Sequence, residues 1–411
     1  MNVSNFIASR LQKQAQKSFS ALIIKVAKVA TALSLTVMIV AVAMVNGFQK
    51  EIRNKAYNLW GNIQIAEYAD NHSYENSPIK LSEEKLKQIS SLPEIKHLQA
   101  FAIKPGIMKK GEQIEGIVLK GIDKNFQSAF FEHYVKKFSG DVKAVFNFND
   151  STPSNKIIVS KKIADRLHLK TGDNCFLYFI DKSPRVRKMN VAAIYSTGLE
   201  EFDKVYSFVD LRVVQKLNNW NNGEVGGYEL FVNNVKKIDT VNSYINQNIL
   251  PLNFASQTIY QLFPTLFDWL NLQDMTEQII IILMTVVALI NVITCFLILI
   301  LERTQMIGIL KTLGMQPFNI KLIFLSLSRR ILVQALVWGN TVGLSICALQ
   351  NYFKIIKLPE ETYYISEVAI DFNWTIIGII NVGFIAVVLL SLWLPAFVIN
   401  YIRPIKAIRF E

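Results

Sequence analysis

The residue types that perform chemistry in enzymes occur here without the spacing that catalysis requires. The four histidines, His72, His97, His133 and His168, stand apart from one another, and no H-E-x-x-H pair or paired-cysteine metal motif occurs. The sequence also lacks the G-x-S-x-G turn of a hydrolase nucleophile and the G-x-x-x-x-G-K-[ST] loop that binds nucleotide phosphates. We therefore expect no enzyme activity, no metal site and no cofactor bound by this chain.

The clearest functional pattern is a short amphipathic segment between two apolar runs. Its apolar positions recur at helical spacing, which predicts a helix with one apolar stripe: Met306, Ile309, Leu310 and Leu313. Gly314 is expected at the C′ position that ends this helix. Such a helix either rests on a lipid surface or inserts into a groove of a cytoplasmic partner.

The sequence contains four apolar runs, two of which flank this segment, and each is long enough to cross a membrane. Of the 411 residues, 51% are hydrophobic and only 18% are charged, which is unusual for a soluble protein. Backbone polar groups in lipid must be hydrogen-bonded within their own segment, so each run is expected to be an α-helix. The predicted transmembrane helices are residues 29–47, 279–301, 321–349 and 374–398. The first could instead be a signal peptide, but its long basic region and long apolar run favour a retained helix.

The positive charge is concentrated in short segments next to the apolar runs. Residues 1–28, 302–330 and 400–411 together carry +11 of the net charge of +12. Because cytoplasmic loops are enriched in Lys and Arg, this places three segments in the cytoplasm: the amphipathic N-terminal segment 1–28, the loop 302–320 and the tail 399–411. The block 48–277 and the loop 350–373 then lie on the periplasmic side of a bacterial inner membrane.

The 48–277 block has the patterns of a mixed α/β domain. Alternating apolar residues predict strands at 62–65, 96–104, 114–120, 156–159, 175–180, 188–194, 206–209 and 228–232. Helices are expected at 82–90, 161–167 and 236–248, with Ser82 as an N-cap. We expect an α/β unit from about 50–139 and 227–260, split by a β-rich insertion at about 140–226. The predicted fold is thus four transmembrane helices with a large α/β periplasmic domain between helices 1 and 2.

Five stretches of the sequence resemble motifs of one superfamily, the FtsX-like ABC transporter permeases, and they follow one another in the same order as in that superfamily. Residues 302–314, which read ERTQMIGILKTLG, resemble its coupling-helix signature, and Pro395-Ala396 with residues 403–409 resemble its C-terminal motif. Three more stretches resemble the permeases of the lipoprotein-releasing (Lol) system: VNGFQKEIR at 45–53, STGLEEFD at 196–203 and LFPTLFDWL at 262–270.

The resemblance implies an inner-membrane permease subunit that pairs with a second permease, either itself or a homologue. It also implies a dimer of separate cytoplasmic ABC ATPases, which would bind ATP and Mg²⁺, while this chain binds neither. The complex would extract lipoproteins from the inner membrane and release them to a periplasmic carrier for outer-membrane sorting. The residues implied to contact the ATPase are Glu302, Arg303, Met306, Ile307, Gly308, Ile309, Leu310, Lys311 and Gly314.

Two further sites are expected from the same resemblance. The acyl chains of the lipoprotein would pass apolar residues of the first two spans, although an ordinary lipid-facing surface has the same composition: Val42, Met44, Val45, Leu283, Val287 and Leu289. The carrier would dock at a hairpin loop that here is short: Asp181, Lys182, Ser183, Pro184 and Arg185. Because the carrier-binding permease of the family has a longer, projecting hairpin, docking at this loop is left open.

Two alternatives remain at this point. The chain could be a mechanotransmission or efflux permease, although the macrolide-exporter type usually carries its ATPase in the same chain. It could also be a regulatory permease that activates a cell-wall hydrolase and transports nothing, although such regulators usually have a shorter outer domain. The identity of the periplasmic partner distinguishes these functions.

Overall fold

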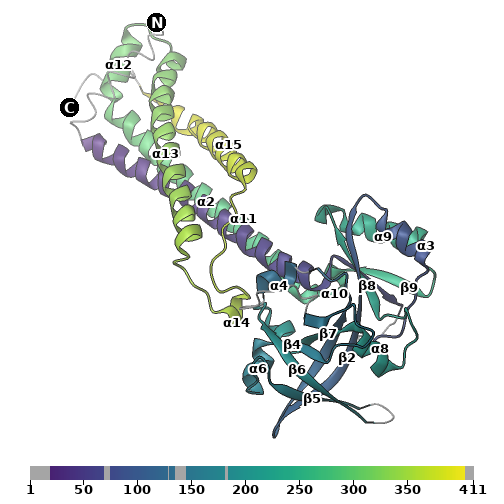
Figure 1. The fold of residues 1–411 in the computed structure, drawn as a ribbon. Coiled ribbons are helices and arrows are strands. Elements are labelled where there is room, and N and C mark those ends of the chain that lie inside the picture. Colours follow the sequence, from purple (N-terminus) through teal and green to yellow (C-terminus); the bar gives the residue numbers. More distant parts are fainter. Residues whose placement is uncertain (1–18, 69–74, 128, 135–144, 181–183, 403–411) are drawn as a thin grey trace. The chain divides into compact units, whose positions relative to one another are not determined.

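The computed structural model describes residues 19–68, 75–127, 129–134, 145–180 and 184–402 (Figure 1). These residues form two compact units. The helical unit contains residues up to Lys50, Trp269–Lys357 and the residues from Glu367 onward. The sheet unit contains Glu51–Asp268 and Leu358–Ser366. The four long apolar helices and the mixed α/β sheet domain predicted from the sequence are both present.

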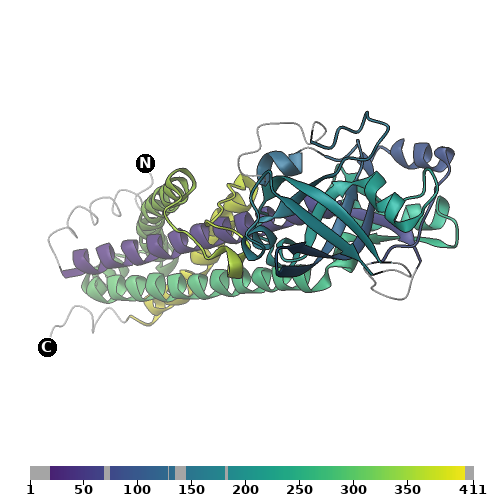
Figure 2. The ribbon, with the colours of Figure 1, turned by 60° about the horizontal axis from the view of Figure 1, so that its bottom comes forward.

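The helical unit is built from α2 (Phe19–Trp60), α11 (Pro264–Glu302), α12 (Thr304–Thr312), α13 (Pro317–Phe353), α15 (Trp374–Ser391), α16 (Trp393–Ala396) and α17 (Val398–Tyr401). Helices α2 and α11 also contribute residues to the sheet unit. Four helical segments are long and apolar enough to cross a membrane: Ile24–Trp60, Pro264–Glu302, Pro317–Phe353 and Trp374–Tyr401. Within the helical unit α2 and α11 run side by side (Figure 2).

The four long helices pack around a shared apolar core. Leu35 and Ile39 of α2 meet Ala288 of α11, Leu332 of α13 and Phe384 of α15. Two polar contacts fix the packing further. Thr36 Oγ1 of α2 donates to the carbonyl of Gly339 in α13 at 3.0 Å. Asn340 of α13 and Asn381 of α15 exchange side-chain hydrogen bonds of 2.7 and 2.9 Å. Interhelical hydrogen bonds and small residues are the usual means by which helices associate in lipid.

The sheet unit has nine strands among the described residues. They are β1 (Ile63–Glu67), β2 (Ile95–Lys110), β3 (Gln113–Ile122), β4 (Lys156–Ser160), β5 (Asn174–Phe179), β6 (Arg185–Tyr195), β7 (Tyr206–Asp210), β8 (Gly227–Val232) and β9 (Phe254–Thr258). The short helices are α3 (Glu83–Ser90), α4 (Ala129–Tyr134), α6 (Lys161–Arg166), α7 (Glu200–Asp203), α8 (Leu211–Asn218), η1 (Val235–Lys237), α9 (Ile238–Asn248), α10 (Ile259–Leu262) and α14 (Glu360–Tyr363). The predicted Ser82 cap is confirmed, because its side chain accepts from the Lys85 N–H.

Six of the strands close into a ring. The pairs run β2–β3, β3–β7, β7–β4, β4–β6, β6–β5 and β5–β2, so the last strand returns to the first. Strand β2 is long enough to serve two purposes. Its residues from Phe101 onward join the ring, whereas Ile95–Phe101 pair with β8, which continues the sheet through β1 to β9. A closed barrel leaves no unpaired strand edge around the ring.

The strands of residues 140–226 therefore form no separate sheet. Strands β4, β5, β6 and β7 complete a barrel with the β2–β3 hairpin, which comes from the preceding part of the chain. Two ring pairs, β3–β7 and β4–β6, are parallel, and the other four are antiparallel. The core of the unit is aliphatic and continuous across the barrel and the flanking sheet. An aromatic cluster around Phe130 and Phe208 adds to it.

Candidate functional site

Helix α12 ends as the sequence predicts. Helix α11 stops at Glu302, and Arg303 has non-helical backbone angles, so the chain turns before α12 starts at Thr304. At the other end Gly314 adopts a φ of 84°. Its N–H donates to the carbonyl of Lys311, and the Met315 N–H donates to the carbonyl of Leu310. This pair of bonds is the Schellman motif, which confirms Gly314 at the C′ position.

The apolar residues of α12 lie on two faces and do not form the single stripe that the spacing predicts. Ile307 is buried, and Met306 and Leu310 pack beside it against Phe296, Phe324 and other residues of the same unit. Ile309 and Leu313, one helical turn apart, remain 48% and 78% exposed. Periodicity places apolar residues on a helix but does not say which side the chain itself will cover. The face available to another molecule is that of Ile309 and Leu313.

Lys311 connects α12 to the end of the last apolar helix. Its Nζ donates to the carbonyls of Ile399 at 2.7 Å, Ile402 at 2.8 Å and Asn400 at 3.4 Å. Carbonyls at a helix C-terminus lack intrahelical partners and carry partial negative charge, so a cation is favourable there. Partial burial lowers the pKa of Lys311. A displacement of α12 would therefore pull on the end of α17.

The other two charged residues predicted at this site form a weaker pair. Glu302 and Arg303 approach within 3.9 Å, and both side chains are partly exposed. An ion pair of this kind adds little stability. Together with Ile309 and Leu313 they lie on or next to the exposed part of α12.

Of the residues predicted to line the lipoprotein path, Val42 and Leu289 share one packed cluster, and the other four differ in exposure. Val42 is buried in the core of the helical unit, and Leu289 packs against that core. Met44 and Val45 are half-buried. Leu283 and Val287 are exposed on α11. Of these six residues, the α11 pair is the most accessible to an acyl chain.

The predicted docking hairpin is described only in part. Asp181, Lys182 and Ser183 lie outside the described residues. Pro184 is exposed, whereas Arg185 is held by the end of α8. Its guanidinium donates to the carbonyls of Leu217 at 2.8 Å and Lys216 at 3.3 Å, and to Asn219 Oδ1 at 3.1 Å. Arg185 therefore has a structural role in α8 capping.

A second site, which sequence reasoning missed, surrounds the C-terminal end of α2 in the sheet unit. Lys120 of β3 is fully buried and donates to Glu229 of β8 at 2.6 Å and to the carbonyl of Leu59 at 2.5 Å. Its ammonium also lies 3.9 Å from the centre of the Trp60 ring. Burial lowers the pKa of Lys120, while Glu229 opposes that shift. We call Lys120, Glu229, Leu59 and Trp60 the α2 anchor.

Another lysine holds the same helix one turn earlier. Lys55 donates to the carbonyl of Thr197 at 2.5 Å and to that of Tyr364 at 2.8 Å. Thr197 and Gly198 belong to the STGLEEFD stretch, and their N–H groups donate to the Asp203 carboxylate at 3.0 Å. Burial raises the pKa of Asp203 to about 6. This stretch therefore shapes a loop in which the Thr197 carbonyl accepts a hydrogen bond from Lys55.

The comparisons with known proteins agree with the resemblance. Residues 278–404 match the family described as "FtsX-like permease C-terminal". The C-terminal part of this chain is thus similar to an FtsX-like permease domain. The matched segment contains most of α11 and all of α12, α13 and α15, and therefore includes the exposed pair Ile309 and Leu313.

Similarity to curated proteins extends beyond the permease domain over nearly the whole chain. The Lipoprotein-releasing system transmembrane protein LolC of Xylella fastidiosa (strain Temecula1) is 21% identical, over 92% of each chain. The protein named LolE in Haemophilus influenzae is 22% identical, over 96% of each chain. An uncharacterized membrane protein of Buchnera aphidicola subsp. Schizaphis graminum is also 22% identical, over 98% of each chain.

Two solved structures are similar to a part of the chain. The extracellular domain of the ABC-type transporter YknZ from Gram-positive bacteria has a TM-score of 0.34 and 12% identity. It covers 48% of this chain and 100% of the solved domain. The periplasmic region of MacB from Actinobacillus actinomycetemcomitans has a TM-score of 0.35 and 11% identity, and covers 53% of this chain and 97% of that region.

Proposed function

We propose that this chain is the permease subunit of an ATP-driven ABC transporter that extracts lipoproteins from the inner membrane and releases them toward a periplasmic carrier. The observation that carries this proposal is the similarity, over 92–96% of the chain, to proteins named as lipoprotein-releasing system transmembrane proteins. The matched permease domain supports the role of a transport subunit.

In this proposal the exposed face of α12 binds the ATPase and moves with it when ATP is bound and hydrolysed. Ile309 and Leu313 insert into a groove on a separate cytoplasmic ATPase, which forms a dimer and binds ATP and Mg²⁺. Glu302 and Arg303 lie at the edge of the contact. Movement of α12 is then transmitted in two ways: through its buried face to α11 and α13, and through Lys311 to the end of α17.

The free energy needed to remove acyl chains from a bilayer explains why lipoprotein extraction needs ATP. Each CH₂ group buried in a bilayer is worth about 0.8 kcal/mol. Three acyl chains on one lipoprotein therefore amount to tens of kcal/mol, roughly, which makes spontaneous release too slow. Leu283 and Val287, which are exposed on α11, are the residues we assign to acyl-chain contact. A second permease subunit, identical or homologous, would supply the other side of the path.

The proposed location follows from the charge pattern. The permease spans the bacterial inner membrane four times, with both termini and α12 in the cytoplasm and the sheet unit in the periplasm. The excess of Lys and Arg in residues 1–28, 302–330 and 400–411 supports this orientation.

The experiment that tests the proposal changes the exposed face of α12. The full chain is co-expressed with its cognate ATPase as wild type, Ile309→Asp and Leu313→Asp. Burying either side chain in a partner contributes about 1.5–3 kcal/mol, and an unpaired buried carboxylate adds a further cost. We expect both variants to insert in the membrane, to lose the ATPase in a pull-down and to leave lipoproteins in the inner membrane. Leu310→Asp is unsuitable, because Leu310 packs against the chain's own core.

Ile114→Asp is the matched control, since Ile114 is an exposed isoleucine in the sheet unit. It should keep both ATPase binding and lipoprotein release. Full ATPase binding by both α12 variants would show that α12 does not couple to the ATPase. If the wild-type complex holds the ATPase but releases no lipoprotein, and instead activates a wall hydrolase, the lipoprotein-releasing function is wrong.

A further inference from the structure

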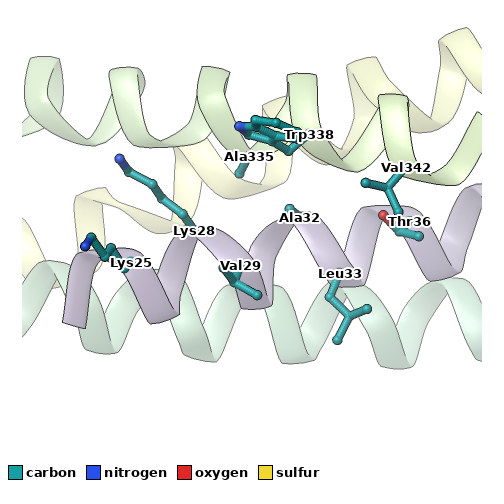
Figure 3. A pocket seen from close by; sticks show the side chains of 9 residues that line it. All are labelled: Lys25, Lys28, Val29, Ala32, Leu33, Thr36, Ala335, Trp338 and Val342. Carbon is teal, nitrogen blue, oxygen red and sulfur yellow. The ribbon is translucent and has the colours of Figure 1, made fainter. Parts of the chain in front are cut away.

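A groove runs along the surface of the helical unit between α2 and α13 (Figure 3). Its volume is about 460 Å³, and apolar side chains form most of its wall. Val29 and Leu33 line it from α2, and Trp338 and Val342 line it from α13. Lys25 and Lys28 lie at the end nearer the N-terminus of α2. All of these residues belong to one unit.

The charge of the groove is confined to that end. Lys25 and Lys28 are three residues apart on α2, so they lie on the same helix face. Residues 1–28 contain no Asp or Glu, so the N-terminal part of the chain cannot neutralise them. Among the described residues the structure gives neither lysine a carboxylate partner. The occupant that fits has a negative charge at one end and an apolar remainder.

The length of the groove matches one leaflet of a bilayer. Its lining on α2 runs from Lys25 to Thr36, which is about 16 Å at 1.5 Å per residue. The hydrocarbon core of a bilayer is about 30 Å thick, so one leaflet contributes about half of that. A single acyl chain with its headgroup at the lysines would therefore fill the groove from the membrane surface to near the midplane.

Trp338 lies between the charged end and the apolar end. Gly339, its neighbour, packs on Ala32 and Leu35, which places Trp338 beside the middle of the α2 lining. The Trp338 side chain is 65% exposed, so it can touch an occupant of the groove. The large apolar ring of tryptophan can pack against an acyl chain that lies in the groove.

We propose that this groove binds one anionic phospholipid from the leaflet in which Lys25 and Lys28 lie. The phosphate is held by the two ammonium groups, and one acyl chain lies along Val29, Leu33, Trp338 and Val342. Basic pockets between transmembrane helices are known to favour anionic headgroups. The proposal goes beyond lipoprotein release and requires only that α2 and α13 lie in a membrane.

The test uses tryptophan quenching by lipids with brominated acyl chains. The purified full chain is reconstituted in phosphatidylcholine vesicles that contain increasing fractions of brominated phosphatidylglycerol. A second series of vesicles contains the same fractions of brominated phosphatidylcholine instead. The difference between wild type and Trp338→Phe isolates the Trp338 signal. Each lysine near an anionic lipid contributes a factor of about five in affinity. We expect phosphatidylglycerol to be preferred at least fivefold at Trp338.

Lys25→Gln/Lys28→Gln should reduce this preference to below twofold while Trp338 remains quenched by either lipid. Lys321→Gln is the matched control, because Lys321 is in the same unit but does not line the groove; it lies over the Phe397 ring. This variant should keep the wild-type preference. Val342→Phe, which fills the apolar end, should remove the saturable quenching of Trp338 by phosphatidylglycerol.

Three results would overturn the proposal. Equal quenching by the two lipids in the wild type would show that the groove has no charge selectivity. A preference that survives removal of both lysines would place the selectivity elsewhere. Absence of quenching by either lipid would show that a protein segment, either the N-terminal residues or another subunit, covers the groove.

Discussion

The α2 anchor provides the sharpest test of how the sheet unit holds α2. Lys120→Met removes the only cation that contacts Glu229 among the described residues, and it also removes the donor to the Leu59 carbonyl. Glu229 keeps two neutral donors, Gln99 Nε2 at 2.7 Å and Gln64 Nε2 at 3.3 Å. A charged carboxylate then remains in a fully buried position without an opposite charge.

The magnitude follows from this burial. Removing one partner of a buried ion pair costs about 3–5 kcal/mol, because the other charge stays uncompensated. For a domain of this size, 1 kcal/mol corresponds to about 2–4 °C in Tm. We therefore expect Lys120→Met to lower the Tm of the sheet unit by about 6–20 °C. The double variant Lys120→Met/Glu229→Met has no unpaired charge. Its remaining loss of stability comes from three polar groups that lose a hydrogen-bond partner, the side-chain amides of Gln64 and Gln99 and the Leu59 carbonyl, at about 1–3 kcal/mol each.

The assay is thermal and urea unfolding of the purified full chain in detergent, followed by the β-sheet circular dichroism signal. Wild type, Lys120→Met, Glu229→Met and the double variant form a double-mutant cycle. We expect the double variant to be more stable than the sum of the single changes predicts, by at least about 2 kcal/mol. Additive single costs, or a Lys120→Met loss below about 1 kcal/mol, would refute the idea that a buried charge pair holds α2.

Three further predictions concern other residues. Burial raises the pKa of Asp203 and of Asp123 to about 6, above the unfolded value of 3.8, so the folded sheet unit holds these protons more tightly. The stability contributed by these two groups should therefore be fully present below about pH 4 and be lost, at about 3 kcal/mol per group, as the pH rises through 6. Asp203→Asn should flatten that loss in urea titrations, and an unchanged pH slope contradicts the assignment. Lys311→Met should increase amide exchange at residues 398–402, because three carbonyl contacts are lost, and unchanged exchange would show that this link is unimportant. Topology reporters at residues 150 and 362 should be periplasmic and those at 312 and 411 cytoplasmic, and cytoplasmic labelling at 150 would reverse the proposed orientation.

The sequence predicts most local structure because local signals determine it. Apolar runs identify the four long helices, and Ser82 and Gly314 mark helix ends through their own side-chain or backbone chemistry. Helices α2 and α11 nevertheless extend beyond the apolar runs, to Trp60 and back to Pro264. The reason is that polar residues continue a helix readily once its buried contacts are made, so hydropathy alone marks the apolar segment and misses the helix end.

The pairing of strands that are far apart in the chain could not be predicted from local sequence patterns. Closure of the barrel depends on β5 meeting β2, two strands separated by more than 60 residues, and no local pattern encodes that contact. Lys120 was missed for a related reason: a lysine in an alternating strand is usually solvent-exposed, and only the fold brings Glu229 beside it. The two faces of α12 also depend on which neighbours cover the helix.

The VNGFQKEIR stretch limits how α2 can move relative to the loop that precedes α15. A side chain at Gly47 would come within 2.3 Å of the Ala369 carbonyl oxygen, so only glycine allows the loop before α15 to lie against α2. The Asp371 N–H donates to the Ala43 carbonyl at 3.0 Å, and the Asp371 carboxylate pairs with Lys50 at 2.7 Å. These contacts fix α2 to the loop that leads into α15. Moving α2 along this loop by one helical turn would break all of these contacts at once, so the loop has to follow this part of α2 in any rearrangement of the unit.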